Sequence, residues 1–299
     1  MNVTFRQLRL FLALAETGSV SAAARRVHVT QPTASMQLRD VTRAVGVPLY
    51  DVVSRRVQLT ATGVELARTA RAITAEWGAF EQRVDALHGL TRGRLSVALV
   101  STAKYFVPRL LGAFCAAHPD VELSLEVLNR DGVVARLREN RDDLYVMSTP
   151  PRDIRLDKAS FLPNPLVVIA AASHPLAARR RLGLPDLAGS RFILRERGSG
   201  TRMAVDAHFR RHRFKPELRL ELGSNEAIRE AVAGNLGIAV LSRHALPARP
   251  QEQGVAILPV RGFPIASAWY VVHPSVRHLS PIARVFRQHL LRAADPGGA

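Results

Sequence analysis

The stretch Ser19–Arg39, SVSAAARRVHVTQPTASMQLR, predicts two short helices separated by a tight turn. Ser21 is expected to begin the first helix, in which three consecutive alanines allow close packing against a neighbouring helix. Val27 and Val29 enclose the turn and point toward a common core. Thr30 is a suitable N-cap for the next helix, and the proline two residues later is tolerated in a first turn, where no intrahelical donor is needed. The pattern therefore indicates a helix-turn-helix.

The outer face of the second predicted helix carries side chains suited to the major groove of DNA. Leu38 and Val41 face inward and leave a polar face outside. Glutamine pairs with adenine, threonine and methionine contact thymine methyl groups, and serine and arginine bind phosphates. An ordinary solvated helix face is the alternative. The candidate DNA-contacting residues here are Ser21, Thr30, Gln31, Pro32, Thr33, Ser35, Met36, Gln37 and Arg39.

A basic hairpin is predicted beside this helix. The segment Val47–Tyr50 is typical of a turn that leads into a strand, and Ser54–Leu59 is typical of a second strand. Arg55 and Arg56 give the hairpin its positive charge and join the candidate DNA-contacting residues. Such a hairpin makes the motif a winged helix-turn-helix, which favours DNA binding over the solvated face.

A long helix is predicted to follow, because the chain runs from Thr60 to Leu90 without proline. Its apolar residues recur at alternating spacings of four and three, which is a heptad repeat. A helix packed on its own core would follow a period of about 3.6 residues and show a broader stripe. We therefore expect pairing with a second copy, and an intramolecular packing helix is the alternative. The predicted dimerisation residues are Leu66, Ala70, Ile73, Trp77, Phe80, Val84 and Leu87.

The composition is that of a globular protein with an anionic partner. Of 299 residues, 47% are hydrophobic and 22% charged, which excludes a disordered chain. The formal net charge of +17 makes nucleic acid the first candidate partner. The single cysteine, Cys115, excludes an intrachain disulfide and a cysteine-cluster metal site. No stretch has the length of a membrane span or the apolar core of an export signal, so a cytoplasmic protein is expected.

Beyond residue 91 the chain alternates strands with helices, which predicts an α/β fold. Two strand-to-helix junctions, Val100–Tyr105 and Arg195–Arg202, combine hydroxyl groups, free backbone N–H groups and cations, which together favour a bound anion. Plain capping with solvated arginines is the alternative. No Gly-Lys-Ser/Thr follows Gly198-Ser199-Gly200, so ATP hydrolysis is unsupported. The candidate effector-binding residues at these junctions are Ser101, Thr102, Lys104, Arg195, Gly200, Thr201 and Arg202.

The stretches Ser19–Ala24, Val29–Ser35 and Arg56–Gly63 resemble the LysR-type transcriptional regulators. The resemblance covers the whole N-terminal region and continues beyond it. It implies an effector module with the fold of periplasmic binding proteins, in which two lobes surround a cleft. It places both junctions at that cleft, together with Asn129 and Asn225, which complete the candidate effector-binding residues.

Within this family, the effector module looks like that of the CbbR-type regulators, which control RuBisCO operons of the Calvin cycle. The stretches that carry this likeness are 101–108, 142–147, 195–203 and 222–228. The likeness implies a phosphorylated metabolite or a nucleotide as effector. A regulator of another metabolic operon that senses a carboxylate is the alternative.

The family resemblance also implies how the chain is organised and what it binds. A DNA-binding domain is expected over 1–60, a linker helix over 61–90, and an effector-binding domain over 91–299, with lobe I at about 91–164 and 267–299 and lobe II at about 165–266. The expected partners are double-stranded DNA with an inverted repeat, a small anionic effector, and further copies in a homodimer or homotetramer. RNA polymerase is a further candidate partner. No cofactor, metal or catalytic residue is expected.

Two other classes of function are disfavoured by the sequence. An enzyme is opposed by the lack of a Gly-x-Ser-x-Gly elbow, a His-Glu-x-x-His motif or a suitably spaced acid pair. A solute-binding protein without regulatory function would need an export signal and would have no use for the N-terminal motif.

Overall fold

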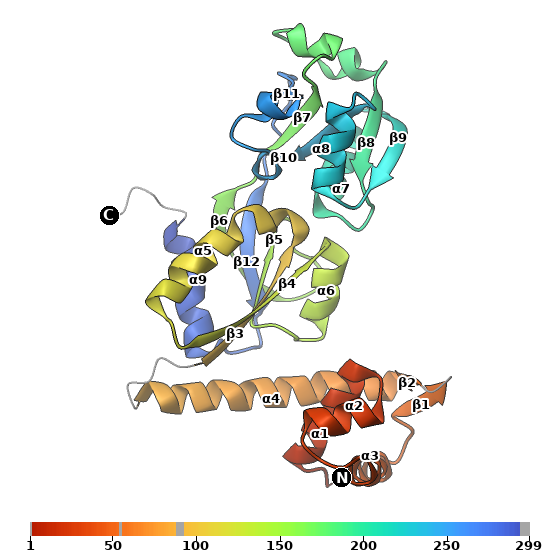
Figure 1. The fold of residues 1–299 in the computed structure, drawn as a ribbon, viewed down its shortest axis with the longest axis vertical. Coiled ribbons are helices and arrows are strands. Elements are labelled where there is room, and N and C mark those ends of the chain that lie inside the picture. The colour runs from red at the N-terminus through yellow and green to blue at the C-terminus, as the bar shows by residue number, and fades with distance from the viewer. Residues whose placement is uncertain (1, 54–55, 88–92, 294–299) are drawn as a thin grey trace. The chain divides into compact units, whose positions relative to one another are not determined.

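The computed structural model describes residues 2–53, 56–87 and 93–293, with side chains in the linker helix up to Val84. The candidate residues Arg55 and the side chain of Leu87 lie outside these described parts. The chain forms two compact units that meet in sequence after Leu87. The first is helical with a small hairpin, and the second is built on two sheets (Figure 1). The predicted α/β class, with a winged helix-turn-helix, a long helix and a two-lobed module, is confirmed.

In its described residues, the first unit packs four helices and a hairpin around one small core. Leu10, Phe11, Leu14, Leu38 and Leu49 are fully buried in it. Its elements are α1 (Phe5–Thr17), α2 (Val20–Arg26), α3 (Gln31–Val45), β1 (Tyr50–Val53), β2 (Arg56–Leu59) and α4 (Ala61–Leu87).

Side-chain caps fix the ends of the helix-turn-helix. The expectation that Ser21 begins the first helix is wrong by one residue, because Ser19 is the cap and its Oγ accepts from the N–H of Ala22 at 3.4 Å. The predicted cap of the next helix is confirmed, since Thr30 Oγ1 accepts from the N–H of Thr33 at 3.4 Å. These caps set the start of α3 and thereby which of its side chains face outward.

The hairpin and the start of α4 pack so closely that one position admits only glycine. Thr60 caps α4, because its Oγ1 accepts from the N–H of Gly63 at 3.1 Å and donates to the carbonyl of Pro48 at 2.8 Å. A β-carbon on Gly63 would overlap the carbonyl oxygen of Leu49. The close approach of backbone to backbone therefore depends on the missing side chain.

Replacing Gly63 with alanine is expected to lower the free energy of unfolding by about 2–3 kcal/mol, because the overlap forces the backbone apart. Gly78 lies in the same helix, and a β-carbon there meets nothing within 4 Å. Gly78→Ala is therefore expected to raise the stability by about 0.5–1 kcal/mol through helix propensity. Urea denaturation of both variants measures the contrast, and changes of the same sign would contradict the close approach.

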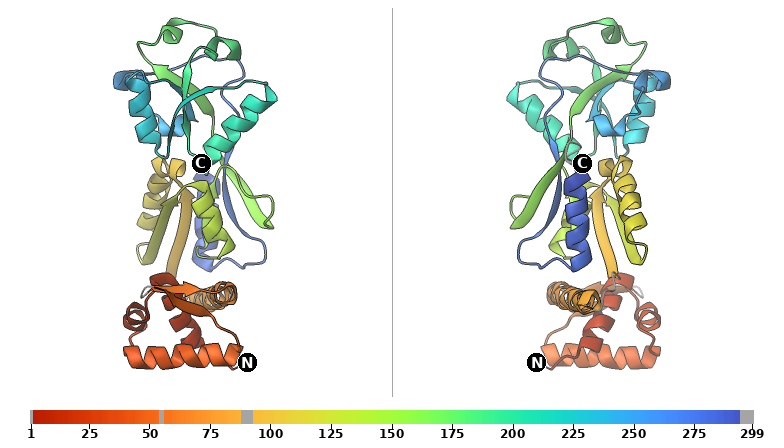
Figure 2. Two further views of the ribbon diagram at one scale, coloured as in Figure 1. Left: turned by 90° about the vertical axis from the view of Figure 1, so that its right-hand side faces the viewer. Right: turned by 90° about the vertical axis from the view of Figure 1, so that its left-hand side faces the viewer.

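The second unit consists of two lobes, each with a five-stranded sheet (Figures 1 and 2). The first lobe has the strand order β4-β3-β5-β12-β6, and the second has β11-β7-β10-β8-β9. The elements of the first are β3 (Gly93–Val100), the 3-10 helix η1 (Ser101–Tyr105), α5 (Val107–Ala117), β4 (Val121–Leu128), α6 (Arg130–Arg138), β5 (Leu144–Met147), β6 (Leu156–Pro163), β12 (Ala268–Pro274) and α9 (Pro281–Ala293). Those of the second are β7 (Leu166–Ala171), η2 (Pro175–Ala178), η3 (Leu184–Leu187), β8 (Arg191–Arg195), α7 (Gly200–Arg211), β9 (Glu217–Leu222), α8 (Asn225–Ala233), β10 (Ile238–Ser242), η4 (Arg243–Ala245), η5 (Pro250–Gln253) and β11 (Val255–Ile257).

The chain crosses between the lobes twice, from β6 to β7 and from β11 to β12. The two crossing segments lie side by side, because the N–H of Asn164 donates to the carbonyl of Ser267 at 2.8 Å. The buried Oδ1 of Asn164 also accepts from the Oγ of Ser242 at 2.6 Å. These two adjacent crossing segments are the covalent connection between the lobes.

Parallel pairing brings the ends of several strands toward the boundary between the lobes. β3 runs parallel to β4 and β5, and β8 runs parallel to β9 and β10. The residues that follow β3, β8 and β9 are therefore available for a site, as is usual at the carboxyl ends of strands in α/β sheets. In the second lobe, α7 and α8 cover opposite faces of the sheet, since each contributes to a separate buried cluster.

Candidate nucleic-acid interface and anion site

The outer face of α3 is only partly as exposed as the sequence predicts. Gln31, Pro32, Met36 and Arg39 are exposed, and Met36 is 51% accessible although it is apolar. Thr33, Ser35 and Gln37 are half-buried. The inward side is as predicted, with Ala34, Leu38 and Val41 buried. The helix thus presents a mixed polar and apolar ridge.

Several polar groups of this ridge already have partners, and others do not. Thr30 and Thr33 share a hydrogen bond between their hydroxyl groups at 2.8 Å, and Gln31 Nε2 donates to Ser35 Oγ at 3.4 Å. The buried Oε1 of Gln37 has no hydrogen-bond partner in the described chain. Exposed cations flank the ridge on both elements, since Arg39 on α3 and Arg56 on β2 make no ion pair with a described carboxylate. Ser21 is exposed on α2.

The predicted dimerisation residues divide into two groups along α4. Leu66 and Ala70 pack on the core of the first unit, so the start of the heptad stripe is used within the chain. Farther along, Ile73, Trp77 and Phe80 are 44%, 51% and 48% exposed. The start of the stripe therefore serves the core of its own chain, and dimerisation through the predicted residues stays a prediction. Val84 is half-buried.

The exposed part of the stripe forms a continuous apolar patch with one residue of α1. The tilted rings of Phe5 and Trp77 have centroids 5.8 Å apart, and the ring of Trp77 lies 5.6 Å from that of Phe80. A hollow of about 340 Å³ opens between these rings and Ile73. Glu81 accepts a hydrogen bond from the indole nitrogen at 2.7 Å, which fixes the ring of Trp77. Large exposed aromatic patches of this kind mark association surfaces.

In the second unit, the candidate anion site is organised by one buried guanidinium group. Arg195, at the end of β8, is 2% exposed. Its Nη1 donates to Asn225 Oδ1 at 2.8 Å and to Thr102 Oγ1 at 3.4 Å, and its Nη2 donates to Ser101 Oγ at 3.3 Å. Asn225 Nδ2 also donates to Thr102 Oγ1 at 3.2 Å. The structure therefore brings together four candidate residues from both lobes.

A carboxylate occupies the remaining face of this guanidinium group. Glu196 accepts from Arg195 Nε at 2.8 Å and from Nη2 at 2.9 Å, a bidentate pair that is the strongest contact of the group. The side chain of Glu196 is 22% exposed, whereas that of Arg195 is 2% exposed. The carboxylate therefore covers the cation from the solvent side.

A second candidate cation is also paired within the chain. Lys104 Nζ lies 2.9 Å from Glu226 Oε1 across the lobe boundary. Burial alone would raise the pKa of Glu226, but the contact with Lys104 and the hydrogen bond from Ser224 lower that pKa to about 2. Burial, reinforced by Glu226, raises the pKa of Tyr105 above its usual value. Glu226 is thus charged throughout the physiological pH range.

Arg202 is paired with two carboxylates of its own lobe. Its Nε donates to Asp206 at 2.9 Å and its Nη1 donates to Glu221 at 2.8 Å. Nη1 also donates to the carbonyl of Arg195 at 2.8 Å, so it positions the end of β8. Two carboxylates therefore offset the charge of Arg202, and its predicted role in effector binding stays a prediction.

The remaining candidates lie where α7 begins next to the first lobe. A β-carbon on Gly200 would lie 3.3 Å from Thr149 Oγ1 and 3.4 Å from Ser148 Oγ, so glycine allows this approach. Thr201 is 6% exposed in the first turn of α7. Asn129 caps α6 through Oδ1, which accepts from the N–H of Gly132 at 2.9 Å, and it also lies beside Gly198. Four further residues at this boundary are not among the effector-binding residues predicted from the sequence: Ser148, Thr149, Glu196 and Glu226.

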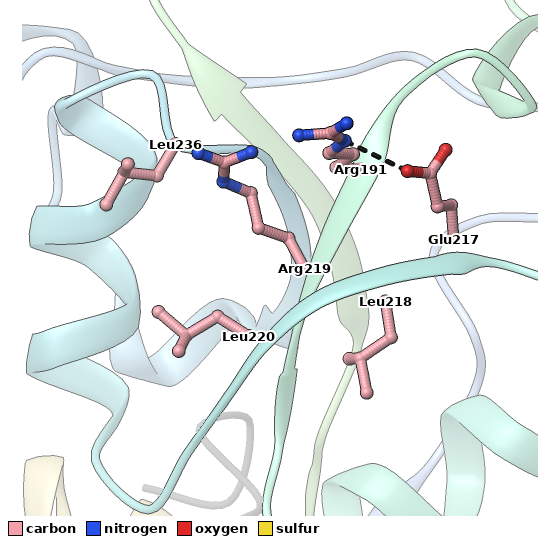
Figure 3. Close-up of a pocket in the computed structure, with 6 residues that line it drawn as sticks. All are labelled: Arg191, Glu217, Leu218, Arg219, Leu220 and Leu236. Atoms are coloured by element: carbon pink, nitrogen blue, oxygen red, sulfur yellow. Dashed lines mark hydrogen bonds and ion pairs between the residues drawn. The ribbon is translucent and has the colours of Figure 1, made fainter.

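A separate hollow of about 380 Å³ lies at the free edge of the second lobe's sheet (Figure 3). It is lined along β9 by exposed Leu218 and Leu220, together with Leu236. A β-bulge pairs these two residues with Phe192 and Ile193, so they point to opposite faces of the sheet. No predicted effector-binding residue lines this hollow.

No helix in the described ranges is long and apolar enough to cross a membrane. Within the same ranges, no group of three histidine, cysteine or acidic side chains is placed to hold a metal ion.

A winged helix-turn-helix joined to a two-lobed module with a buried cation defines a class: transcriptional regulators that respond to a small molecule. Two family models match the chain. The bacterial regulatory helix-turn-helix of the lysR family matches residues 5–64, and the LysR substrate binding domain matches residues 88–295. The chain belongs to the LysR family of DNA-binding transcriptional regulators.

Curated relatives match almost the whole chain. The RuBisCO operon transcriptional regulator of Acidithiobacillus ferrooxidans is 41% identical, over 99% of this chain and 96% of its own. The HTH-type transcriptional activator CmpR of Synechocystis sp. is 40% identical, over 97% and 95%. These relatives are named as regulators, which confirms the expectation that the chain is not an enzyme.

A solved structure matches the second unit. The regulatory domain of CcmR from Synechocystis PCC6803, in complex with 2-PG (2-phosphoglycolate), is 45% identical with a TM-score of 0.67. The match covers 70% of this chain and all of that one. The likeness to CbbR-type regulators that the sequence indicates is therefore confirmed.

Proposed function

We propose that this chain controls carbon-fixation operons and that it senses a small phosphorylated anion at the boundary between its lobes. The observation that carries the effector proposal is Arg195, a buried cation that donates to Thr102 and Ser101 of one lobe and to Asn225 of the other. A buried guanidinium group with hydroxyl and amide partners suits a phosphate or carboxylate. The relatives named for RuBisCO operons, and the relative bound to 2-PG, support the operon class and the phosphorylated ligand.

The effector binds by replacing Glu196 on Arg195. Glu196 makes the strongest contact of the guanidinium group and is its only charged partner among the described residues, with a side chain 22% exposed, so an incoming anion competes with this carboxylate. The cross-lobe contacts of Thr102 then change, because its hydroxyl group accepts from both Arg195 and Asn225. A change in lobe closure alters the separation of the DNA-reading surfaces and hence the bend of the bound DNA.

The DNA-reading surface comprises the outer ridge of α3 together with Ser21 of α2 and the hairpin cations, of which Arg56 is described. The apolar patch on α4 joins two copies, so that two recognition helices bind an inverted repeat. We keep the division into residues 1–60, 61–90 and 91–299 for this scheme. A homodimer or homotetramer in the cytoplasm, with RNA polymerase as a further partner, completes the proposal.

The decisive experiment is a fluorescence-anisotropy titration of the purified protein against DNA from the intergenic region upstream of its own gene. It is repeated with 2-phosphoglycolate, sugar phosphates, NADPH and simple dicarboxylates. Specific binding modulated by a phosphorylated compound is expected. A response to a dicarboxylate alone would favour the regulator of another metabolic operon and would overturn the phosphorylated effector.

Replacing Arg39 with glutamine is expected to weaken operator binding and to flatten its dependence on salt. Each lost phosphate contact lowers the slope of log affinity against log salt by about 1. The matched control is Arg68→Gln, since Arg68 is exposed in the same unit but pairs with Glu65 at 2.8 Å. Anisotropy titrations at several salt concentrations measure both variants, and equal slopes would remove Arg39 from the interface.

A further inference from the structure

Most of the positive charge of this DNA-binding chain lies outside its DNA-reading unit. Residues 1–87 carry 11 basic and 7 acidic side chains, a net charge of +4. Subtracting these from the totals of 42 and 25 leaves 31 basic and 18 acidic side chains in residues 88–299, a net charge of +13. Few of these basic side chains lie at the effector site. Most of the positive charge of residues 88–299 is therefore elsewhere on the second unit.

A group of exposed cations without carboxylate partners gathers in the second lobe. We call it the distal basic surface. All seven side chains are exposed, and none forms an ion pair with a described carboxylate. Its members are Arg180, Arg181, Arg210, Arg211, Arg213, Lys215 and Arg261.

Three chain segments bring these cations to one region. The N–H of Arg261 donates to the carbonyl of Leu182 at 2.8 Å, which places it beside Arg181. Arg181 and Arg261 line one hollow of about 780 Å³ together with Phe263. The ring of Phe263 lies 4.7 Å from that of His208 on the last turns of α7. Arg180 directly precedes Arg181 in the chain, and the other four cations lie within the seven residues after His208.

This surface is remote from the effector site. α7 begins beside the first lobe at Gly200 and carries the chain roughly 18 Å away over its 12 residues. The nearby acids are already engaged: Asp186 pairs with Arg179 at 2.8 Å and Asp206 pairs with Arg202 at 2.9 Å. The field of the seven cations is therefore not offset locally.

We propose that the distal basic surface binds the phosphate backbone of duplex DNA outside the sequence read by α3. Arginine predominates in it, and arginine is the side chain best suited to phosphate because of its planar, always charged fork. A ligand for seven unpaired cations must carry many negative charges, and DNA is the polyanion that this family binds. Such contacts extend the protein's hold on its operator without adding sequence specificity.

The test compares two triple variants of the full-length protein. The first is Arg181→Gln/Arg210→Gln/Arg211→Gln. The matched control, Arg152→Gln/Arg155→Gln/Arg284→Gln, removes three exposed, unpaired arginines from the first lobe. Each protein is titrated against a duplex limited to the operator and against one extended on both sides, at several salt concentrations. A melting curve of each variant confirms that it is folded.

On the extended duplex, the first variant is expected to lose about 2–3 from the salt slope, because about 0.9 is lost for each phosphate contact removed. On the short duplex, the salt slope of the first variant is expected to equal that of the wild type. The control variant is expected to have the wild-type slope on both duplexes. Equal slopes for the first variant and the wild type would overturn the proposal and point to an acidic protein partner. Equal losses in both variants would reduce the effect to net charge and would also overturn it. Neither failure affects the effector proposal, which depends on the response to ligand.

Discussion

The Arg195→Gln variant is expected to bind operator DNA but to lose its response to the anionic effector. Arg195 is 2% exposed and supplies the charged donors at the lobe boundary. Losing charge-assisted hydrogen bonds at a buried site costs about 2–5 kcal/mol, which corresponds to an effector affinity at least about 30-fold weaker. Isothermal titration calorimetry with 2-phosphoglycolate measures the affinity, and anisotropy with the operator shows whether DNA binding is retained.

Arg197→Gln is the matched control for this variant. Arg197 lies two residues farther along the chain, is exposed, and makes no ion pair with a described carboxylate. Its replacement should change the affinity by less than about threefold, since exposed charges contribute little. If the two variants lost affinity equally, long-range charge rather than the buried guanidinium group would explain binding.

The companion variant Glu196→Gln tests the competition at this site. Glutamine keeps the size of the side chain but removes the charge that offsets Arg195. An effector that replaces Glu196 should then bind more tightly, because it displaces a weaker partner. Unchanged or weaker binding would show that Glu196 stays on Arg195 in the complex.

The sequence predicts those features that depend on local periodicity and on single side chains. Thr30 as a cap and Leu38 as an inward residue follow from their positions alone, and the structure confirms both. The start of α2 is misplaced by one residue because Ser19 and Ser21 are equally good caps by composition. Pattern alone does not distinguish two candidates so close together.

The sequence does not reveal which side chains form ion pairs or pack together in the folded chain. Arg195, Lys104 and Arg202 all count as free cations in the sequence, yet Glu196, Glu226 and Glu221 neutralise them. Glu196 lies inside the Arg195–Arg202 junction that points to an anion site, so an acidic neighbour was a usable signal there. In the same way, the heptad spacing of α4 does not show that α1 covers Ala70 and leaves Trp77 exposed.

The exposed part of α4 leads to the prediction for assembly. Ile73→Glu is expected to dissociate the dimer, because it places a carboxylate in the middle of the apolar patch formed with Trp77 and Phe80. Burying an unpaired charge at an interface costs several kcal/mol, so the dissociation constant should rise at least about 100-fold. Sedimentation velocity over a range of protein concentrations measures this change.

Val64→Glu provides the control within the same helix. Val64 is 47% exposed, close to the 44% of Ile73, but it lies outside the heptad stripe. The Val64→Glu variant should therefore leave the dimer intact. The Ile73→Glu variant should bind a duplex with one half-site as tightly as a duplex with two, because recognition of both half-sites depends on two joined copies. A dimer that survives Ile73→Glu would show that α4 packs only within its own chain. Self-association would then have to be sought elsewhere, with the free edge of β9 at Leu218 and Leu220 as the next candidate.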